Sequence, residues 1–278
     1  MDQVWLYLVG ALSLAIVVIW LGLPVLLRGL GLHRRIRLPK RDLKGRRALI
    51  VATSHDVLDA TGKKTGVFAS EMTAPYYTFL DAGMTVDVAS IRGGEIPIEP
   101  VSLKWPLRSH FDVRFLADPA FRSKVKRAPA VAAVNGAAYD IVFLAGGWGA
   151  AYDFEQSPDL GAMLLAADRS GAVIGGVCHG PLGLLAVSEG QGASLVSGRR
   201  LTAVTDKQVR ELGITHTPRH PERDLRAAGA KFESSTGFRD IFASHVVADG
   251  RLVTGQNQND GAETADRMIQ VALEGARS

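Results

Sequence analysis

The sequence predicts one membrane-spanning helix followed by an α/β sandwich with a mostly parallel central sheet. Three observations lead to this prediction. Residues 4–27 carry no charge, residues 48–278 alternate short apolar strands with capped helices, and the single cysteine of the chain stands where one of these strands ends. We therefore divide the 278 residues into an anchor with its linker, 1–47, and one globular domain, 48–278.

Composition and charge exclude several classes of protein. Hydrophobic residues make up 47% and charged residues 22% of the chain, which is typical of globular proteins and not of disordered or collagen-like ones. The net charge of +4 belongs to one segment, because residues 28–47 carry nine Lys/Arg against one Asp. Residues 48–278 carry 23 Lys/Arg against 26 Asp/Glu, a net −3. A nucleic-acid-binding surface on the domain is therefore not expected.

The uncharged stretch 4–27 is long enough to cross a bilayer. A helix rises about 1.5 Å per residue, and the hydrocarbon core is roughly 30 Å thick. A cleaved signal peptide is the alternative, but such a peptide needs a basic start and a small-residue cleavage site, and this chain begins with an acidic residue and has no A-x-A pattern. We expect a retained single-pass anchor in the cell membrane.

The basic residues that follow the stretch set its orientation. By the positive-inside rule, the C-terminal side of the helix and the domain behind it face the cytoplasm. The basic cluster either contacts anionic lipid headgroups or serves only as a stop signal in a solvated linker. A cytoplasmic location also suits a reduced thiol.

Strand and helix signals alternate along the domain. Ser70 is a candidate N-cap and Gly83 a stop for the first helix, and Asp118 with Pro119 begins the second. We predict strands at 48–53, 85–91, 139–147, 172–177, 200–205 and 250–256, and helices at 70–82, 118–128, 157–171, 181–187 and 261–274. This order predicts a parallel sheet in one domain, with 100–138 as an insertion of small helices.

The run AVIGGVCHGPLGLL over 172–185 carries the strongest chemical signal. An apolar strand ends at Cys178, and a helix is predicted within three residues, with glycines around the corner. This arrangement is typical of a nucleophile elbow. We expect the helix N-terminus to lower the pKa of the thiol and His179 to act as base or proton shuttle. The alternative is a buried structural cysteine.

Several blocks of the domain resemble the PfpI and parkinsonism-associated deglycase superfamily, within it the heat-shock chaperone/glyoxalase III branch. The blocks are TGKKTGVFASEMTAPYYTFLDAG, VDVASIRGGEIPIEPVS, YDIVFLAGGWGAAYDF, VCHGPLGLL and LVTGQNQND. The resemblance covers about 48–278 and implies a flavodoxin-like α/β/α sandwich, a PfpI-like catalytic domain. It also implies a possible homodimer.

The resemblance assigns roles to two acidic residues. It implies that Glu71 lies beside the reactive sulfur, where the residues alone show only an acid in the first turn of a helix. It implies that Asp206 orients the histidine as the third member of a triad. Asp206 also fits an N-cap for the short helix that follows, and both roles are compatible.

The glycine-rich block around residues 146–148 is expected to form one wall of the site. Gly147 and the amide of His179 would donate to an oxyanion, with Gly146 beside them. Trp148 stands where the family usually has a histidine in a Gly-Gly-His-Gly run, so the pocket wall and the substrate are expected to differ.

No metal or cofactor is predicted. His216 and His220 have the spacing of a helical zinc pair, but the prolines between and after them favour a loop. The tripeptide His220-Pro221-Glu222 resembles the end of an amidotransferase triad, yet it lies too close in sequence to Cys178, and we treat it as unrelated to the site. No nucleotide-binding motif occurs.

These observations together predict a cofactor-independent lyase. The resemblance implies a glutathione-independent conversion of 2-oxoaldehydes, such as methylglyoxal, to 2-hydroxy acids, with Cys178 as nucleophile. Two alternatives stay open at this point. One is a membrane-anchored stress chaperone or deglycase-like module, and the other is a cysteine peptidase or amidase that uses the same elbow.

Overall fold

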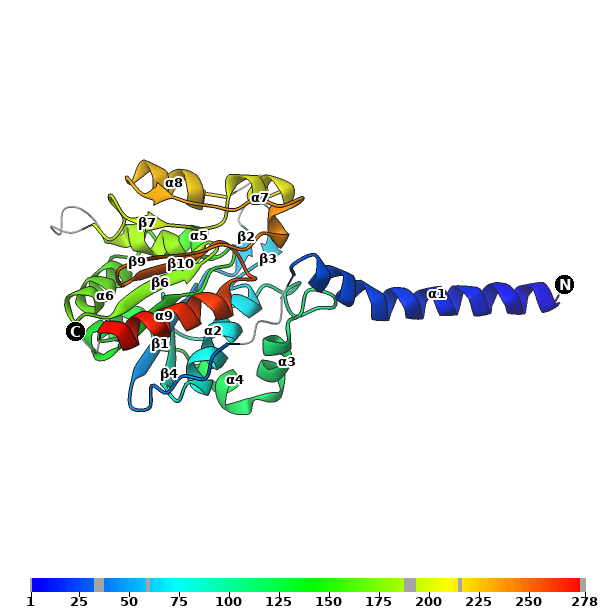
Figure 1. Ribbon diagram of the computed structural model, residues 1–278, viewed down its shortest axis with the longest axis horizontal. Helices are drawn as coiled ribbons and strands as arrows, with labels where there is room; N and C mark the ends of the chain where they lie inside the picture. The colour runs from blue at the N-terminus through cyan, green and yellow to red at the C-terminus, as the bar shows by residue number, and fades with distance from the viewer. Residues whose placement is uncertain (1, 33–37, 59–60, 188–193, 215–216, 276–278) are drawn as a thin grey trace.

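The sequence folds around one six-stranded sheet whose order is β4-β1-β5-β6-β10-β9 (Figure 1). The computed structural model describes all residues except 1, 33–37, 59–60, 188–193, 215–216 and 276–278. The neighbouring pairs in the sheet are parallel, except that β9 pairs antiparallel with β10. The strands are β1 (Arg47–Ala52), β4 (Thr85–Ser90), β5 (Ile141–Leu144), β6 (Val173–Val177), β9 (Val246–Asp249) and β10 (Leu252–Gly255).

Both faces of the sheet are covered, because its central strands are apolar throughout. Successive side chains of a strand point to opposite faces, so Ile50 and Leu49 of β1 belong to different core clusters. On the Ile50 side lie α2 (Ala69–Asp81) and α9 (Gly261–Gly275), and on the Leu49 side lies α6 (Pro158–Arg169). The predicted α/β/α sandwich with a mostly parallel sheet is confirmed.

Shorter elements surround this core. Two small sheets join β2 to β3 and β7 to β8. These strands are Val57–Leu58, Lys63–Lys64, Arg200–Leu201 and Lys231–Phe232. The helices are α3 (His110–Ala117), α4 (Pro119–Lys126), α5 (Ala150–Asp153), α7 (Asp206–Glu211) and α8 (Pro221–Ala227), and the 3-10 turns are η1 (Val131–Ala133), η2 (Gly136–Ala138), η3 (Gly180–Ala186) and η5 (Asp240–Phe242).

Three local predictions are wrong, two because distant residues decide the outcome and one because proline is favourable at the first position of a helix. Ser70 is not the N-cap of α2, since the helix begins at Ala69 and the Ala69 amide donates to the Ser102 hydroxyl at 3.1 Å. The strand expected over 200–205 ends at residue 201 and pairs with β8 outside the central sheet. The loop expected around His220 contains α8, which begins at Pro221, a position where a missing N–H costs no helical hydrogen bond.

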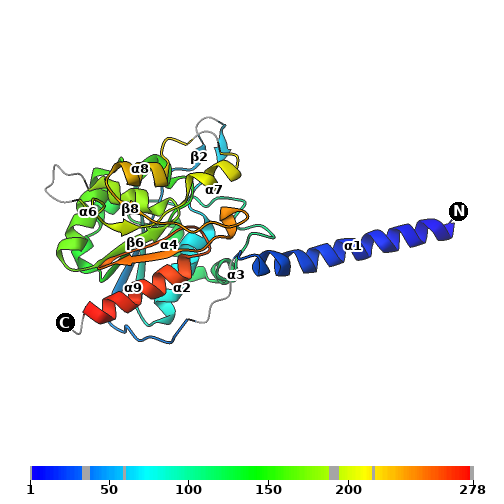
Figure 2. The same ribbon diagram turned by 45° about the horizontal axis from the view of Figure 1, so that its top comes forward.

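The apolar stretch at the N-terminus forms one continuous helix, α1 (Asp2–Gly29). Gln3–Gly29 is apolar and long enough to cross a membrane by length and composition, and none of its most apolar window is buried in the protein. It projects away from the sandwich in both views (Figures 1 and 2).

Removal of the α4 cap is expected to destabilise the domain. The Asp118 carboxylate accepts hydrogen bonds from the amides of Ala120 and Phe121, both at 3.0 Å, and from the Tyr77 hydroxyl at 3.0 Å. Asp118→Ala leaves these donors without their acceptor and should lower the free energy of unfolding by about 1–2 kcal/mol, measured by denaturant titration of the purified chain. Asp118→Asn keeps an acceptor oxygen and should lose less. Equal losses in the two variants would contradict the capping role.

Candidate active site

The backbone turns sharply at Cys178, directly after β6. Cys178 has a φ of 60°, and among the residues that the structure describes it is the one non-glycine residue with a positive φ. Its amide donates to the Gly255 carbonyl at 3.1 Å, and its carbonyl accepts from the Val204 amide at 3.0 Å. A cysteine in this left-handed conformation is strained, and neighbouring segments hold it there. The corner therefore has the geometry of the predicted nucleophile elbow.

Glycine is required on the wall opposite the sulfur. Gly147 has a φ of 101°, which an L-residue rarely adopts. A β-carbon on Gly146 would lie 2.8 Å from the His179 amide nitrogen and closer still to the Glu71 carboxyl. Because neither glycine carries a side chain, the chain at the end of β5 can lie close to the thiol. The backbone amides of Gly147 and His179 point at the sulfur.

The element after the cysteine differs from the prediction. It is the 3-10 turn η3 over residues 180–186, and not an α-helix, with a proline near its start. The expected depression of the thiol's pKa is also wrong. Burial and the neighbouring Glu71 carboxyl raise the pKa of Cys178 well above its ordinary value, and the His179 and Gly147 amides oppose this rise only partly.

Glu71 lies against the sulfur, as the resemblance implies. It stands in the first turn of α2 with 1% of its surface exposed, and its side chain hydrogen-bonds the Cys178 side chain. Burial, the largest cause, raises the pKa of Glu71 to about 8, and the charge of Asp260 adds to the rise. A carboxyl that titrates near neutral pH both gives and takes protons, which suits general acid–base catalysis.

His179 is fully buried beside the thiol. Its Nδ1 lies 3.4 Å from Cys178 Sγ, and its ring meets the Trp148 ring edge-on with 4.3 Å between centroids. Burial first, and then the charge of His220, lower the pKa of His179 to about 3. The imidazole is therefore neutral near pH 7.

Asp206 is not hydrogen-bonded to His179 among the described residues. It is the first residue of α7, whose N-cap is Thr205, so the N-cap reading of Asp206 is wrong. Its Oδ1 lies 3.7 Å from His220 Nδ1, and its amide donates to Glu222 at 3.0 Å. The tripeptide 220–222, which we treated as unrelated to the site, thus packs on Asp206, and its histidine acts electrostatically on His179.

No group of three His, Cys, Asp or Glu residues that would hold a metal occurs in the part of the chain that the structure describes. His216, the other half of the possible zinc pair, lies outside the described residues.

One acidic residue of the site was missed. Asp260 is fully buried directly before α9, where its carboxylate accepts from the Gln256 and Asn257 amides at 3.0 and 3.1 Å and from the Ser244 hydroxyl at 2.6 Å. Burial raises the pKa of Asp260 to about 6. The LVTGQNQND block contained the signal, an acid directly before a helix, but the contacts of Asp260 with the distant Ser244 hydroxyl and His245 amide arise only in the fold.

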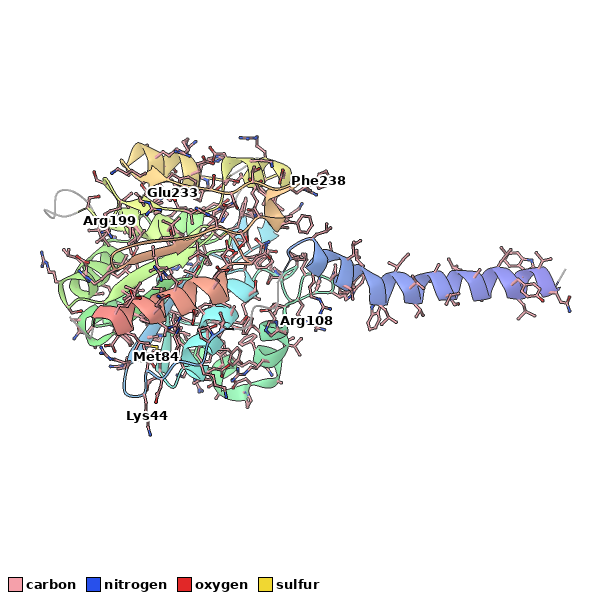
Figure 3. The ribbon with its side chains drawn as sticks, in the orientation of Figure 1. Lys44, Met84, Arg108, Arg199, Glu233 and Phe238 are labelled. Atoms are coloured by element: carbon pink, nitrogen blue, oxygen red, sulfur yellow. The ribbon has the colours of Figure 1, made fainter. Side chains whose placement is uncertain are left out.

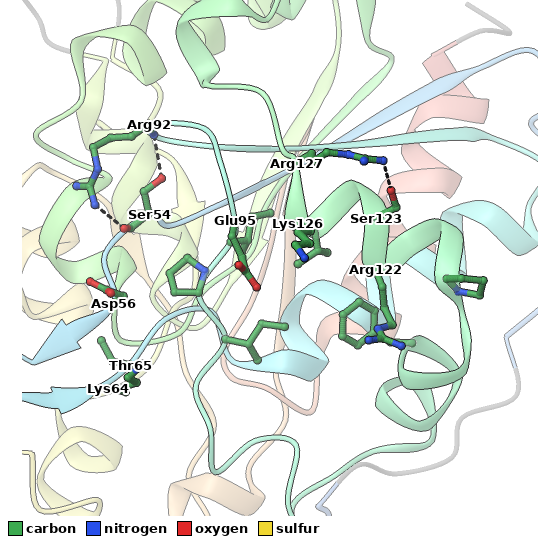
Figure 4. Close-up of a pocket in the computed structure, with 16 residues that line it drawn as sticks. Ser54, Asp56, Lys64, Thr65, Arg92, Glu95, Arg122, Ser123, Lys126 and Arg127 are labelled. Atoms are coloured by element: carbon green, nitrogen blue, oxygen red, sulfur yellow. Dashed lines mark hydrogen bonds between the residues drawn. The ribbon is translucent and has the colours of Figure 1, made fainter.

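The thiol opens into a cavity of about 400 Å³. Glu71, Gly147, Trp148 and His179 line it together with Cys178, and most of the remaining wall is apolar. A larger cavity of about 980 Å³ is lined by Ser54 and by several basic residues, among them Arg92 and Arg127 (Figure 4). Arg92 and Arg127 donate to Ser54 and Ser123 there, and no nucleophilic thiol is present. The smaller cavity is therefore the candidate active site.

Comparison with known proteins gives consistent matches. The sequence profile of the DJ-1/PfpI family matches residues 64–270. The chain is 30% identical over 232 residues to the glutathione-independent glyoxalase HSP31 of Saccharomyces cerevisiae, covering 81% of this chain and 97% of that protein. The crystal structure of glyoxalase III from Candida albicans superposes with a TM-score of 0.73 at 26% identity, covering 81% of this chain and 97% of that one.

A bacterial structure matches equally well. The Rapid Encystment Protein of 24 kDa from Francisella tularensis superposes with a TM-score of 0.75 at 32% identity, over 82% of this chain and 99% of that one. These three relatives are matched almost entirely, while about a fifth of the present chain has no counterpart in them.

The raised pKa of Glu71 predicts how stability depends on pH. The carboxyl titrates at 4.5 when unfolded and at about 8 when folded, so the folded state holds an extra proton between these values and loses stability as pH rises through this window. Glu71→Gln removes this loss. Its free energy of unfolding, relative to wild type, should rise by several kcal/mol from about pH 4.5 to about pH 8 and then level off.

Chemical denaturation at a series of pH values measures this difference. Glu95→Gln, the same change on an exposed side chain, is the control and should show no such trend. Parallel stability curves for Glu71→Gln and wild type would contradict the raised pKa.

Proposed function

Because the chain belongs to the DJ-1/PfpI family, we propose that it is a glutathione-independent glyoxalase that converts 2-oxoaldehydes, such as methylglyoxal, to 2-hydroxy acids. The observation that carries this proposal is the contact between the Glu71 carboxyl and the Cys178 sulfur. A nucleophile beside a proton carrier of pKa about 8 is what an internal oxidation–reduction of one substrate requires. The names of the matched relatives support the same reaction.

The first step joins the sulfur to the aldehyde carbon. Cys178 Sγ attacks this carbon while the thiol proton passes to His179 Nδ1, 3.4 Å away. The aldehyde oxygen gains the negative charge, and the amides of Gly147 and His179, which point at the sulfur, stabilise it. The proton then returns from His179 to this oxygen and gives a hemithioacetal.

The second step moves a proton between neighbouring carbons. Glu71, as a carboxylate, takes the proton from the former aldehyde carbon and gives it to the adjacent carbonyl carbon through an enediol, while the proton of the hemithioacetal hydroxyl passes to the neighbouring carbonyl oxygen. The first carbon is thereby oxidised to a thioester and the second is reduced to an alcohol, so no external oxidant or reductant is used. Water then hydrolyses the thioester, releases the 2-hydroxy acid and restores the thiol.

We also propose that α1 anchors the domain in the cell membrane, with residues after Gly29 on the cytoplasmic side. An exposed helix that is apolar on every side is unfavourable in water and is stable in a bilayer. Arg28 in its last turn and the basic residues beyond it support the orientation. The homodimer that the resemblance implies, and Asp206 as a positioning residue for the histidine, stay predictions.

Loss of the nucleophile should abolish the reaction. Cys178→Ala, which keeps a β-carbon in the same left-handed conformation, should lower lactate formation from methylglyoxal without glutathione by at least about 10³-fold, with unchanged far-ultraviolet circular dichroism. Retained lactate formation would overturn the mechanism. Peptide or amide turnover without methylglyoxal turnover would favour the hydrolase alternative, and unchanged suppression of client aggregation in the variant would favour a chaperone.

The anchor should keep the chain in the membrane fraction through an alkaline carbonate wash. A chain that lacks residues 1–27 should be released, because the apolar segment is gone. Recovery of full-length chain in the soluble fraction, or cleavage after residue 27, would contradict the proposal.

Orientation needs new cysteines, since Cys178 is buried and its resistance to labelling is uninformative. In the Cys178→Ala background, Lys44→Cys should react with an impermeant maleimide only after cells are permeabilised. Gln3→Cys, at the other end of α1, should react in intact cells. The reverse pattern would place the domain outside.

A further inference from the structure

We propose that this active site acts on amphiphilic 2-oxoaldehydes that carry an apolar chain and enter from the bilayer surface. This inference rests on the proposed glyoxalase function and adds to it the class of substrate. It follows from the two chemical characters of the cavity wall and from the place where α1 joins the domain.

Polar groups without partners surround the thiol. Glu71 Oε2, Trp148 Nε1 and His179 Nε2 are buried and have no hydrogen-bond partner among the described residues. Each of these side chains is more than nine-tenths buried and lines the cavity that holds Cys178. Buried polar atoms are normally paired, so these three point to a polar ligand head, whose adjacent carbonyl oxygens accept hydrogen bonds and whose hydroxyls, formed during the reaction, donate them.

The rest of the cavity wall is largely apolar. Its charged members besides Glu71 are Lys63, Lys64 and Glu99, and the two lysines lie in the exposed strand β3. A volume of about 400 Å³ is in the range of cavities that hold drug-sized ligands and is far larger than a three-carbon aldehyde needs. The apolar lining residues are Leu32, Leu58, Phe68, Val101, Leu107, Val204, Leu212, Ile214 and Ile241.

The base of α1 is part of this wall. Leu32, three residues beyond the helix, is 3% exposed and lines the cavity. A β-carbon on Gly31 would lie 2.6 Å from the Phe242 carbonyl, so the chain there runs directly against the domain next to Ile241. The helix that is proposed to enter the membrane therefore ends at the active-site cavity and not at the end of a free tether.

The length of α1 places this junction at the membrane surface. Gln3–Gly29 has 27 residues, about 40 Å of helix, which exceeds the hydrocarbon core by roughly 10 Å. Trp20, within the last turns, stacks on Trp105 of the domain with ring centroids 6.5 Å apart. Tryptophan is enriched in the headgroup region, so this pair marks the depth to which the domain approaches the bilayer.

Exposed apolar side chains gather around the same junction. Helix α3 and the end of α7 lie near the base of α1 in both ribbon views (Figures 1 and 2). Phe238, 94% exposed, and Arg108 lie on the side of the domain that faces α1 (Figure 3). Further exposed apolar residues are Val113 and Leu116 in α3, Leu212 directly after α7, and Val101 and Trp105 in the segment before α3. Apolar side chains with a basic neighbour fit a surface that rests on lipid.

When the apolar chain of a substrate moves from water into this cavity, every methylene that is buried adds to the binding energy. Each buried methylene raises affinity by up to roughly fourfold, so kcat/KM should rise along a series of 2-oxoaldehydes. The experiment uses the full chain in phosphatidylcholine vesicles without glutathione. Methylglyoxal, 2-oxohexanal and 2-oxodecanal are compared, and 2-oxodecanal should exceed methylglyoxal in kcat/KM by at least about tenfold.

The outcomes separate the two proposals. Turnover of methylglyoxal with a kcat/KM that stays flat or falls with chain length would overturn the present inference and leave the glyoxalase function intact. No turnover of any 2-oxoaldehyde would overturn both.

A matched pair of variants localises the effect to the cavity. Leu212 and Leu80 are similarly exposed, 41% and 38%, but only Leu212 lines the cavity, and Leu80 lies in α2, outside the apolar surface around the base of α1. Leu212→Asn should lower the 2-oxodecanal to methylglyoxal ratio of kcat/KM by about five- to tenfold, and Leu80→Asn should leave this ratio unchanged. Because each variant is compared with itself on two substrates, a loss of folded protein does not change the ratio. Equal ratios in both variants would overturn the assignment of this wall to the apolar chain.

Discussion

The active site depends on one strained backbone conformation, the left-handed turn of Cys178 at the end of β6. Two hydrogen bonds hold it, one to the Gly255 carbonyl in β10 and one from the Val204 amide. The turn brings the sulfur within reach of Glu71 from α2 and of His179 beside it. The contact with Glu71 exists only when the central sheet has formed in the observed order, because α2, β6 and β10 come from distant parts of the chain.

Burial gives this site an electrostatic character different from that of a thiolate at an α-helix N-terminus. The thiol, the Glu71 carboxyl and the His179 imidazole are all almost inaccessible to water, and burial shifts the pKa of each toward its neutral form. The amides of Gly147 and His179 point at the sulfur. Buried atoms of Glu71, Trp148 and His179 have no hydrogen-bond partner among the described residues, which is costly for a fold.

The N-terminal helix changes the surroundings of a domain that this chain shares with its relatives. The three reported relatives match almost over their whole length, so the catalytic sandwich is common to them and to this chain. The additional N-terminal segment of this chain leads to Leu32, a buried leucine on the wall of the active-site cavity. The N-terminal helix and the active site are thus one connected structure, which is the physical ground for the proposed link between a membrane and the choice of substrate.

The sequence by itself determined the features that local chemistry controls. Apolar runs and capped helices predicted five of the six strands of the central sheet, the layers and the apolar N-terminal helix, and Cys178 between glycines predicted the elbow, because short-range sterics govern each of them. Tertiary structure alone decided the cap of α2, which comes from Ser102, the partner of Asp206, which is His220, and the sign of the thiol's pKa shift. Each of these depends on groups that are far apart in sequence and on the loss of water around them, and no pattern of neighbouring residues records either.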